Sequence, residues 1–503
     1  MSRETKTSRR PLVLTSIIMA MFMSAIEGTI VATAMPNIVG DLGGFSLYSW
    51  VFSGYLLMNA LTILIYGKLA DLFGRKPVII FGIIIFLIGS LLAGLSSSMK
   101  MLILFRFIQG IGAGAIQPIA TTIVGDIYTV QERSKIQGYL SSVWGISAII
   151  GPALGGVFVQ YFNWAWVFWM NLPLGVLAII GISAFFHENL EKTSHKVDYK
   201  GSALLFIALS SLMIVFIEGG TAWGWTSLPV ILLIALFLVC FIVFIFQEKR
   251  TEEPIVPLSI WKKPLIAVAN SVNLTTGVIM IGLSSFLPAY VQVVMGEPAI
   301  VAGFTLTTMS IGWPIASTIT GRLILKMGYR PLAIIGGVSL IIGGCFFLFL
   351  SPSKGPVWAG IGSFFIGIGM GMTTTVFIIS IQNSVEWKVR GVATASNMFM
   401  RQMGNTVGAA LLGGILNKRL QTFIENKGAE NRLSVNSANA VLSGGTNQFS
   451  HQALELLKQG LTLALHTVYI GVFVFAVISL ILILVMPKQS IKNLPNSENN
   501  KTS

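Results

Sequence analysis

Three ionisable side chains lie deep inside long apolar stretches of this sequence, and they are its clearest candidates for chemistry. Glu27 lies near the middle of the apolar run 12–36, while Arg106 and Arg401 lie within two later runs. If these runs cross a membrane, each charge costs about 3 kcal/mol at the bilayer centre, and such residues are usually functional. A desolvated carboxyl favours its protonated form, so Glu27 could accept a proton on one side of a membrane and release it on the other.

Each of the three residues also has a structural interpretation. Glu27 could be a static acid held by an ion pair or by hydrogen bonds, and Arg106 could be a base that is hydrogen-bonded to carbonyls. Arg106 lies less than two helical turns from Lys100, which marks the outer end of its run. Arg106 could therefore lie at the same depth in the membrane as Glu27. Arg401 has no acid nearby in the sequence, and it is either a second base in a cavity or a satisfied structural one.

The elements that must position these residues are long apolar helices. Of the 503 residues, 54% are hydrophobic and 10% are charged, and the mean hydropathy of +0.79 excludes a soluble globular protein. Runs of about 20 apolar residues, enough to cross about 30 Å of hydrocarbon as a helix, recur along the whole length. The sequence therefore predicts an all-α polytopic membrane protein with fourteen spans. They are expected near 12–36, 48–69, 77–95, 100–125, 136–160, 164–187, 200–219, 227–247, 264–292, 299–322, 331–350, 356–382, 389–417 and 460–486.

Basic residues predict the orientation of these spans. Lys and Arg stay on the cytoplasmic side during insertion, and most of the 33 fall in segments that are cytoplasmic if both termini are inside. The net charge of +14 then reflects topology and attraction to anionic headgroups, so nucleic-acid binding is not indicated. Cys240 and Cys345 fall in separate spans and suggest neither a metal site nor a disulfide. We expect a multi-pass protein of a bacterial plasma membrane, without a cofactor.

Three sequence landmarks recur about half a chain apart and indicate a duplication. They pair the segments 67–77 with 321–331, 106–114 with 363–371, and 151–156 with 408–414. Two parallel halves around a midplane cavity are the architecture of rocking transporters. The predicted units are an N-terminal six-helix half at 1–190, a linker with two inserted transmembrane helices at 191–260, a C-terminal six-helix half at 261–487, and a cytoplasmic tail at 488–503. The two inserted helices are expected outside the bundle.

The segment between the second and third predicted spans carries a dense motif of glycines and charges. Its members are Gly67, Leu69, Asp71, Gly74, Arg75 and Lys76. The glycines permit a tight turn, and Asp71 can cap the positive end of a neighbouring helix or pair with a base as a gate closes. A solvated loop set by topology alone would explain the bases but not Asp71.

This motif resembles the signature of the major facilitator superfamily, specifically its 14-helix drug:proton antiporter group, and the resemblance covers residues 10–487. It implies that the Asp and Arg of the motif form a cytoplasmic gate with an acid at the end of the fourth helix. Asp126 occupies that place, and Arg133 follows it.

The fifth predicted span resembles the Gly-Pro signature that marks the antiporters of this family. Its residues are Gly145, Gly151, Pro152, Gly155 and Gly156. A proline bends a helix and glycines let another helix approach, so these residues could form a pliable seam between the halves. Ordinary packing of small residues is the alternative interpretation.

The resemblance also gives Glu27 and Arg106 their expected roles in proton coupling. Related antiporters usually carry Asp at the position of Glu27, and Arg106 begins a helix-4 signature that implies a part in proton transfer. Tyr55, Trp144, Tyr290 and Arg401 are candidates for lining a cavity.

We expect a proton-driven exporter of lipophilic or cationic small molecules that works by alternating access. A dedicated exporter or flippase for one metabolite, lipid or antibiotic is the alternative. No catalytic cluster suggests an enzyme, and the sequence identifies no protein partner; a monomer is compatible with it.

Overall fold

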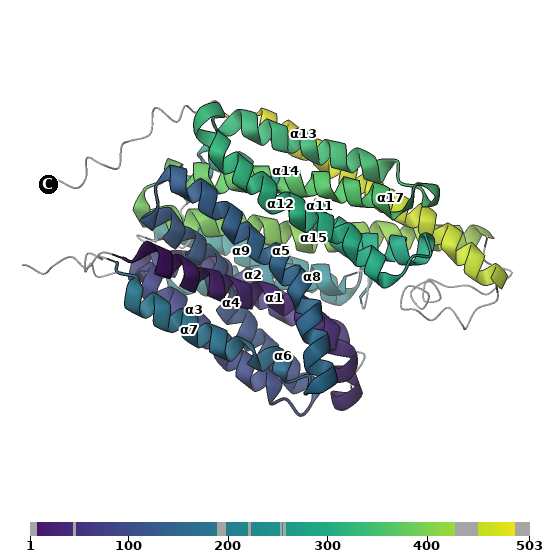
Figure 1. The fold of residues 1–503 in the computed structure, drawn as a ribbon, viewed down its shortest axis with the longest axis horizontal. Coiled ribbons are helices and arrows are strands. Elements are labelled where there is room, and N and C mark those ends of the chain that lie inside the picture. Colours follow the sequence, from purple (N-terminus) through teal and green to yellow (C-terminus); the bar gives the residue numbers. More distant parts are fainter. Residues whose placement is uncertain are drawn as a thin grey trace, which may run out of the picture.

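The computed structural model describes residues 8–43, 47–188, 198–219, 223–251, 254, 258–427 and 451–487. Within these residues there are fourteen helices of 15 residues or more, one for each predicted span, which confirms the all-helical fold class (Figure 1). The long helices are α1 (Arg10–Leu42), α2 (Tyr48–Phe73), α3 (Arg75–Gly94), α4 (Met99–Ile127), α5 (Val130–Tyr161), α7 (Asn171–Phe185), α8 (Tyr199–Glu218), α9 (Leu228–Arg250), α11 (Pro264–Ala289), α12 (Ala299–Met327), α13 (Tyr329–Leu348), α14 (Gly355–Ser384), α15 (Arg390–Lys427) and α17 (His451–Leu484). The short ones are α6 (Trp166–Trp169), α10 (Leu258–Trp261), η2 (Tyr290–Val294), η3 (Pro352–Lys354) and η4 (Trp387–Val389).

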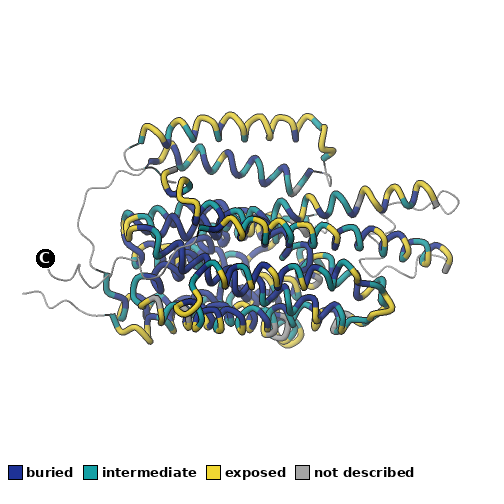
Figure 2. The backbone as a smooth tube through the Cα atoms, turned by 90° about the horizontal axis from the view of Figure 1, so that it is seen from above, coloured by how far each residue is buried: buried dark blue, intermediate teal, exposed yellow. Residues whose placement is uncertain are grey.

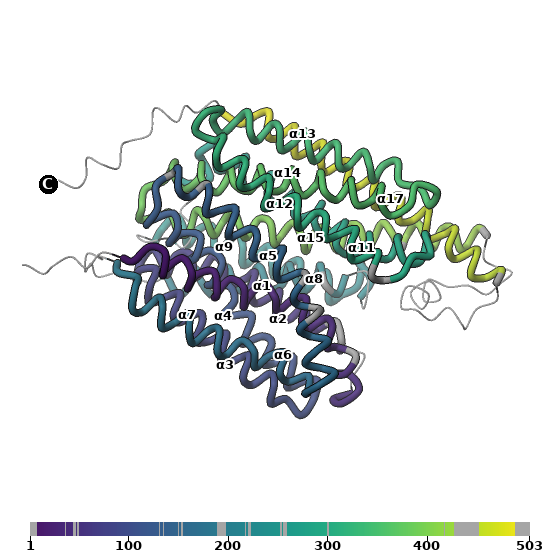
Figure 3. Tube along the Cα trace, in the orientation of Figure 1, coloured from purple at the N-terminus to yellow at the C-terminus, as the bar shows by residue number. Residues whose placement is uncertain are grey.

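Several helices differ from their predicted bounds. The sixth predicted span is divided into α6 and α7, and Pro173 lies in the first turn of α7, where its missing N–H leaves no bond unmade. The predicted span 264–292 changes from α-helix to a π turn after Pro288, whose ring lies inside the last turn of α11. α15 and α17 extend further than predicted and project together beyond the bundle, as the yellow-green end of Figure 3 shows.

Eleven helices within the described ranges are long and apolar enough to cross a membrane. The other three long helices are α5, α12 and α15. These three are prominent where the first and second parts of the chain meet, because α5 packs along α12 and α15 packs along α2.

The helices form two groups and a hairpin. α1 to α7 pack mainly on one another, except that α5 packs on both α1 and α12, and α11 to α17 likewise pack mainly on one another. The first residues of α1 and the last residues of α17 lie on the same side of the bundle in Figure 1. We call that end of the bundle, where α1 begins and α17 ends, the terminal end. α8 and α9 form a hairpin on one flank, visible as two outlying helices in Figure 2, and the outer helix α9 is largely exposed. The predicted domain bounds at 190, 260 and 487 stay a prediction.

The repeated turn is made by the same backbone device in both groups. Gly74 separates α2 from α3 with φ of 93°, and Gly328 separates α12 from α13 with φ of 83°. Residues with a Cβ rarely adopt such values, so glycine is required at both positions. Gly67 has a different role, since a Cβ there would lie 2.5 Å from the Cβ of Ala395 and push α15 away from α2.

Candidate functional site

Glu27 and Arg106 meet in the interior of the first helix group. Arg106 Nη1 lies 2.5 Å from Glu27 Oε1, and both residues are fully buried. The Nε of Arg106 donates to the carbonyl oxygen of Val51 at 3.1 Å, and the guanidinium lies 4.2 Å from the centre of the Tyr55 ring. The acid therefore comes from α1 and its base from α4, and α2 supplies the Val51 carbonyl and the Tyr55 ring.

Neutral polar side chains complete this network. Asn171, the first residue of α7, donates from Nδ2 to Glu27 Oε2 at 2.8 Å and to Ser90 Oγ at 2.9 Å. Gln109 accepts from Arg106 Nη1 at 2.7 Å and donates to Ser90 Oγ at 3.1 Å. Each buried charge thus has several partners, which offsets its desolvation.

Sequence reasoning missed these three neutral residues. Gln109 was within reach of it, because it follows Arg106 by three positions and therefore shares its helix face. Asn171 and Ser90 are distant in sequence from Glu27, and only the packing of α3 and α7 against α1 and α4 brings them to it.

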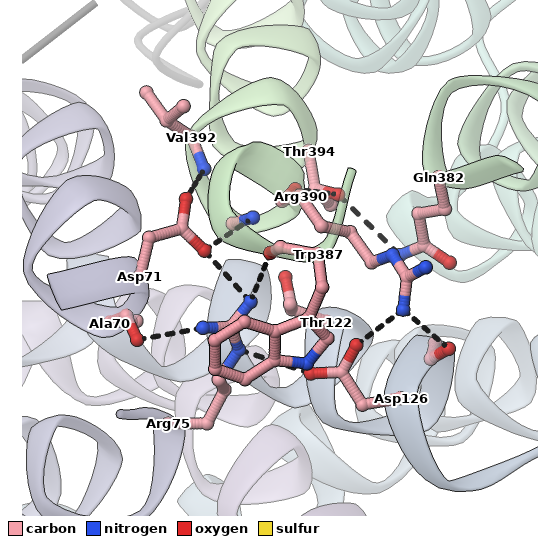
Figure 4. A network of polar contacts seen from close by, with 12 residues as sticks. Ala70, Asp71, Arg75, Thr122, Asp126, Gln382, Trp387, Arg390, Val392 and Thr394 are labelled. Carbon is pink, nitrogen blue, oxygen red and sulfur yellow. Dashed lines mark hydrogen bonds and ion pairs between the residues drawn. The ribbon is translucent and has the colours of Figure 1, made fainter. Parts of the chain in front are cut away.

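Asp71 joins the two helix groups at the terminal end (Figure 4). Its carboxylate oxygens accept hydrogen bonds from the backbone N–H groups of Gly391 and Val392, at 2.9 and 2.8 Å, in the first turn of α15. The carboxylate also lies 2.8 Å from the guanidinium of Arg75. An acid at a helix N-terminus is favoured by the exposed N–H groups and by the helix dipole. Asp71 therefore caps a helix that lies more than 300 residues further along the chain.

Arg75 and Asp126 extend the same contact. Arg75 lies 3.0 Å from Asp126, donates to the carbonyl of Trp387 at 3.0 Å, and has its guanidinium 3.9 Å from the centre of the Trp387 ring. Asp126 also pairs with Arg390 at 2.6 Å. Acids and bases alternate through Asp71, Arg75, Asp126 and Arg390, and Figure 4 shows them facing one another across α2, α3, α4 and α15. We call these four residues the charged latch.

Glu188 is a further acid, next to the charged latch, that the sequence did not indicate. Its carboxylate accepts from the backbone N–H groups of Arg75 and Lys76, both at 3.1 Å, and so caps α3. Burial raises the pKa of Glu188, against the lowering effect of these hydrogen bonds and of Arg75. The Nζ of Lys76 donates to the carbonyls of Ser183 and Phe186 at 2.7 Å, so Lys76 fixes the end of α7 rather than joining the latch.

The residues that correspond to the charged latch in the repeat form a second contact between the helix groups. In this contact neutral side chains replace Asp126 and Arg75. Arg133, at the start of α5, donates to Asn383 Oδ1 at 3.0 Å, at the end of α14, and Asn383 Nδ2 donates to the hydroxyl of Tyr329 at 2.9 Å. Asn383 precedes Arg390 by the same interval by which Asp126 precedes Arg133, and Tyr329 follows Gly328 as Arg75 follows Gly74. We call Arg133, Asn383 and Tyr329 the neutral latch, because the two residues that join Arg133 in it carry an amide and a hydroxyl rather than charged groups.

The glycines of α5 have different neighbours. A Cβ on Gly145 would lie 2.9 Å from the carbonyl oxygen of Ser310 on α12, whereas Cβ atoms on Gly151 and Gly155 would meet Thr29 and Ile30 or Thr33 on α1. A Cβ on Gly156 would meet nothing within 4 Å. Of these four glycines, Gly145 alone lies at the junction with the second helix group. The side chain of Pro152 lies outside what the structure describes.

The four cavity candidates do not form one cluster. Tyr55 packs on Arg106, Tyr290 is fully buried with its ring 5.6 Å from that of Tyr469, and Trp144 is 43% exposed on α5. Arg401 lies partly buried on α15, with its guanidinium 5.8 Å from the centre of the Trp313 ring on α12. Among the described residues, no group of three or more His, Cys, Asp or Glu could hold a metal ion.

Comparison with known proteins agrees with this architecture. A family model described as Major Facilitator Superfamily matches residues 17–409. Multidrug transporter protein MdtP of Bacillus subtilis is 37% identical over 429 residues, which are 85% of this chain and 79% of that protein. Multidrug resistance protein 3 of the same organism is 34% identical over 97% of both chains. The human organic anion transporter MFSD10 superposes with a TM-score of 0.63 at 14% identity, covering 94% of this chain and 99% of the other, a likeness of fold.

Proposed function

We propose that this chain, which belongs to the Major Facilitator Superfamily, is a proton-driven exporter of several chemically different drugs. As a member of that family it is a membrane-embedded transporter of small molecules and not an enzyme. The observation that carries the proposal is the 34% identity to Multidrug resistance protein 3 over 97% of both chains, because it includes the helices of both groups.

The proposed coupling group is Glu27. Within the described residues of the two helix groups it is the one carboxylate enclosed at mid-helix, and it holds its charge through Arg106 and Asn171. A proton arriving at Oε1 would remove the attraction that holds Arg106 there. The base would keep its bonds to Gln109 and Val51, while α1 would lose its charged contact with α4. Protonation would thus loosen a junction inside the first helix group.

The proposed gate is the charged latch. It joins α2, α3 and α4 to α15 at the terminal end, and the neutral latch joins α5 to α14 at the same end. Because basic residues are concentrated at that end in the predicted topology, we assign it to the cytoplasm. The structure is then the state with the cytoplasmic side closed, and transport requires both latches to open. The membrane assigned is the bacterial plasma membrane.

Transport into everted membrane vesicles tests the function. Vesicles with the chain should take up ethidium and neutral aromatic drugs under a proton-motive force, and the uptake should stop when an uncoupler is added. Drug addition should also release protons from acidified vesicles that contain the chain and not from control vesicles. Uptake of one compound out of a broad panel would assign a dedicated exporter instead, and uptake that ignores the uncoupler would reject proton coupling.

A further inference from the structure

Arg401 is a base inside a long helix that lacks an ionic partner. Among the residues that the structure describes, no carboxylate lies within ion-pair distance of its guanidinium, which also donates no hydrogen bond. The ring of Trp313, 5.8 Å away, is its aromatic neighbour. The side chain is nevertheless mostly shielded, since Arg401 is only partly accessible.

The contrast with the other mid-helix base is sharp. Arg106 has Glu27, Gln109 and the carbonyl of Val51 as partners, so its charge is neutralised and its donors are used. Glu27 and Arg106 cancel each other, and Arg401 therefore leaves one uncompensated positive charge among these three residues. An unpaired base in a shielded environment is costly, and an anion that reaches it recovers that cost.

Arg401 belongs to one of the helices through which the second helix group contacts the first. α15 packs along α2, and α12 packs along α5, so Arg401 and Trp313 lie on the two helices that make the junction between the groups. Asn405 follows Arg401 by one helical turn, so the two side chains leave α15 on the same face. The Nδ2 of Asn405 donates to Oε1 of Gln402 at 3.3 Å, a long hydrogen bond that an anionic ligand could replace.

We propose that Arg401 binds the anionic group of a transported substrate, and that Trp313 packs against its aromatic or apolar body. This inference rests on the proposed export function and names a substrate class within it, namely amphiphiles with a carboxylate or a sulfonate. A guanidinium binds both groups through two parallel N–H donors, and a Trp face accepts a flat apolar ring. A monovalent lipophilic cation would be repelled at the same position, so it must bind elsewhere or more weakly.

The test uses two fluorescent probes that share an apolar ring system. Anilinonaphthalene sulfonate carries the anion, N-phenyl-naphthylamine lacks it, and ethidium serves as a cationic probe. Their transport is measured with the purified full chain in phosphatidylcholine proteoliposomes under a proton-motive force. The variants are Arg401→Gln, Arg401→Lys and, as a matched removal of a charge elsewhere, Lys326→Gln on α12.

We expect Arg401→Gln to raise the KM for the sulfonate about ten- to a hundredfold, the loss that follows from one charge-assisted contact, and to leave the neutral probe unchanged. Arg401→Lys should recover most of the affinity, and Lys326→Gln should resemble the parent. An unchanged KM for the sulfonate in Arg401→Gln overturns the inference. Equal loss of all three probes, with the same loss in Arg401→Lys, makes Arg401 structural and overturns it too.

Three further outcomes separate this inference from its alternatives. If the parent transports ethidium and the neutral probe but not the sulfonate, the substrate class is wrong and the export function stands. If the parent transports none of the probes, the export function itself fails and this inference fails with it. If phosphatidylglycerol in the vesicles competes with the sulfonate in the parent but not in Arg401→Gln, the anion is a lipid headgroup rather than a substrate.

Discussion

At the scale of single residues, Glu27 is an acid whose charge depends on its neighbours. The carboxylate has Arg106 on one oxygen and Asn171 on the other, and these two partners are fully buried. Removing one member of a buried ion pair costs about 3–5 kcal/mol, because the other charge is left alone. Neutralisation of Glu27, by protonation or by mutation, therefore acts first on Arg106.

The first prediction is that Glu27→Gln abolishes uphill drug transport and leaves downhill exchange of a neutral drug intact. Gln keeps the size and the hydrogen bond from Asn171 but cannot release a proton. Glu27→Asp should keep partial activity, since it retains the carboxyl at a shorter reach. Drug-driven proton release from vesicles is the measurement. Pumping against a gradient by a well-expressed Glu27→Gln protein would reject Glu27 as the coupling residue.

A static role for Glu27 leads to a different result for the same variant. Glu27→Gln would then express poorly, because Arg106 would be buried without its counter-charge, and Glu27→Gln combined with Arg106→Gln would restore expression. Comparing the expression and the melting temperature of the single and double variants separates the two roles.

At the scale of helices, the charged latch and the neutral latch join the two helix groups at the terminal end, and they differ in charge. The charged latch has a carboxylate at Asp126, whereas the neutral latch has an amide at Asn383. Asp71 adds a helix cap on α15 in the charged latch, but the equivalent residue in the repeat is Leu325, and α5 is capped by its own Thr129 and Glu132. The junction is therefore asymmetric, with most of its charge on the α15 side.

The second prediction concerns the cap. Asp71→Asn should impair transport and leave insertion intact, because an amide cannot accept both α15 N–H bonds with the strength of a carboxylate and cannot pair with Arg75. Transport rates at equal protein amount in vesicles provide the measurement. Normal turnover by properly inserted Asp71→Asn protein would exclude the charged latch as a gate, and Lys262→Asn serves as the control.

The third prediction concerns the neutral latch. Asn383→Asp would give Arg133 a charged partner, which should stabilise the closed terminal end by about 1 kcal/mol and slow the transport cycle. Closure can be followed by the rate at which a thiol reagent labels Ser317→Cys, because Ser317 lies on α12 and is buried against Ser141 of α5. The other two cysteines are removed by Cys240→Ser and Cys345→Ser. Slower labelling supports the latch. Unchanged labelling and an unchanged transport rate would mean that Arg133 and Asn383 do not control closure.

At the scale of the whole molecule, the α8–α9 hairpin lies on the flank of the bundle where α2 meets α15. α8 contacts both α2 and α15, and its Leu205 and Leu209 pack in the same apolar cluster as Leu61 and Phe399 of those helices. α9 lies outside α8 and exposes a row of large apolar side chains, as expected of a surface that faces lipid. The hairpin therefore has to follow, or slide on, any movement of α2 against α15.

The fourth prediction is that transported drug does not reach the hairpin. A photoactivatable substrate should label α12 or α15 and not the middle of α8 or α9, and Leu232→Ala with Leu236→Ala on the exposed face of α9 should leave transport unchanged. Peptide mapping of the labelled protein is the measurement. Label in the middle of α9, or a crosslink from there to Glu27, would contradict a peripheral position.

The sequence by itself was sufficient for the fold class and the family. Apolar runs long enough to cross a bilayer are local features, so their number was confirmed, and the Gly67 to Lys76 motif identified the family without any tertiary contact. The pairing of Glu27 with Arg106 could be suggested from depth alone, because a membrane places residues of equal distance from its surface at the same level.

Only the tertiary structure decided which partners these residues have. Asn171, Glu188 and Asn383 have ordinary polar side chains in sequence, and they acquire a role because helix packing brings them to Glu27, Arg75 and Arg133. The rotation of each helix about its axis also decided that Tyr290 is enclosed and that Arg401 faces Trp313. In an all-apolar span the periodic pattern that would indicate the buried face is weak, so the sequence could place a residue at a depth but not on a face.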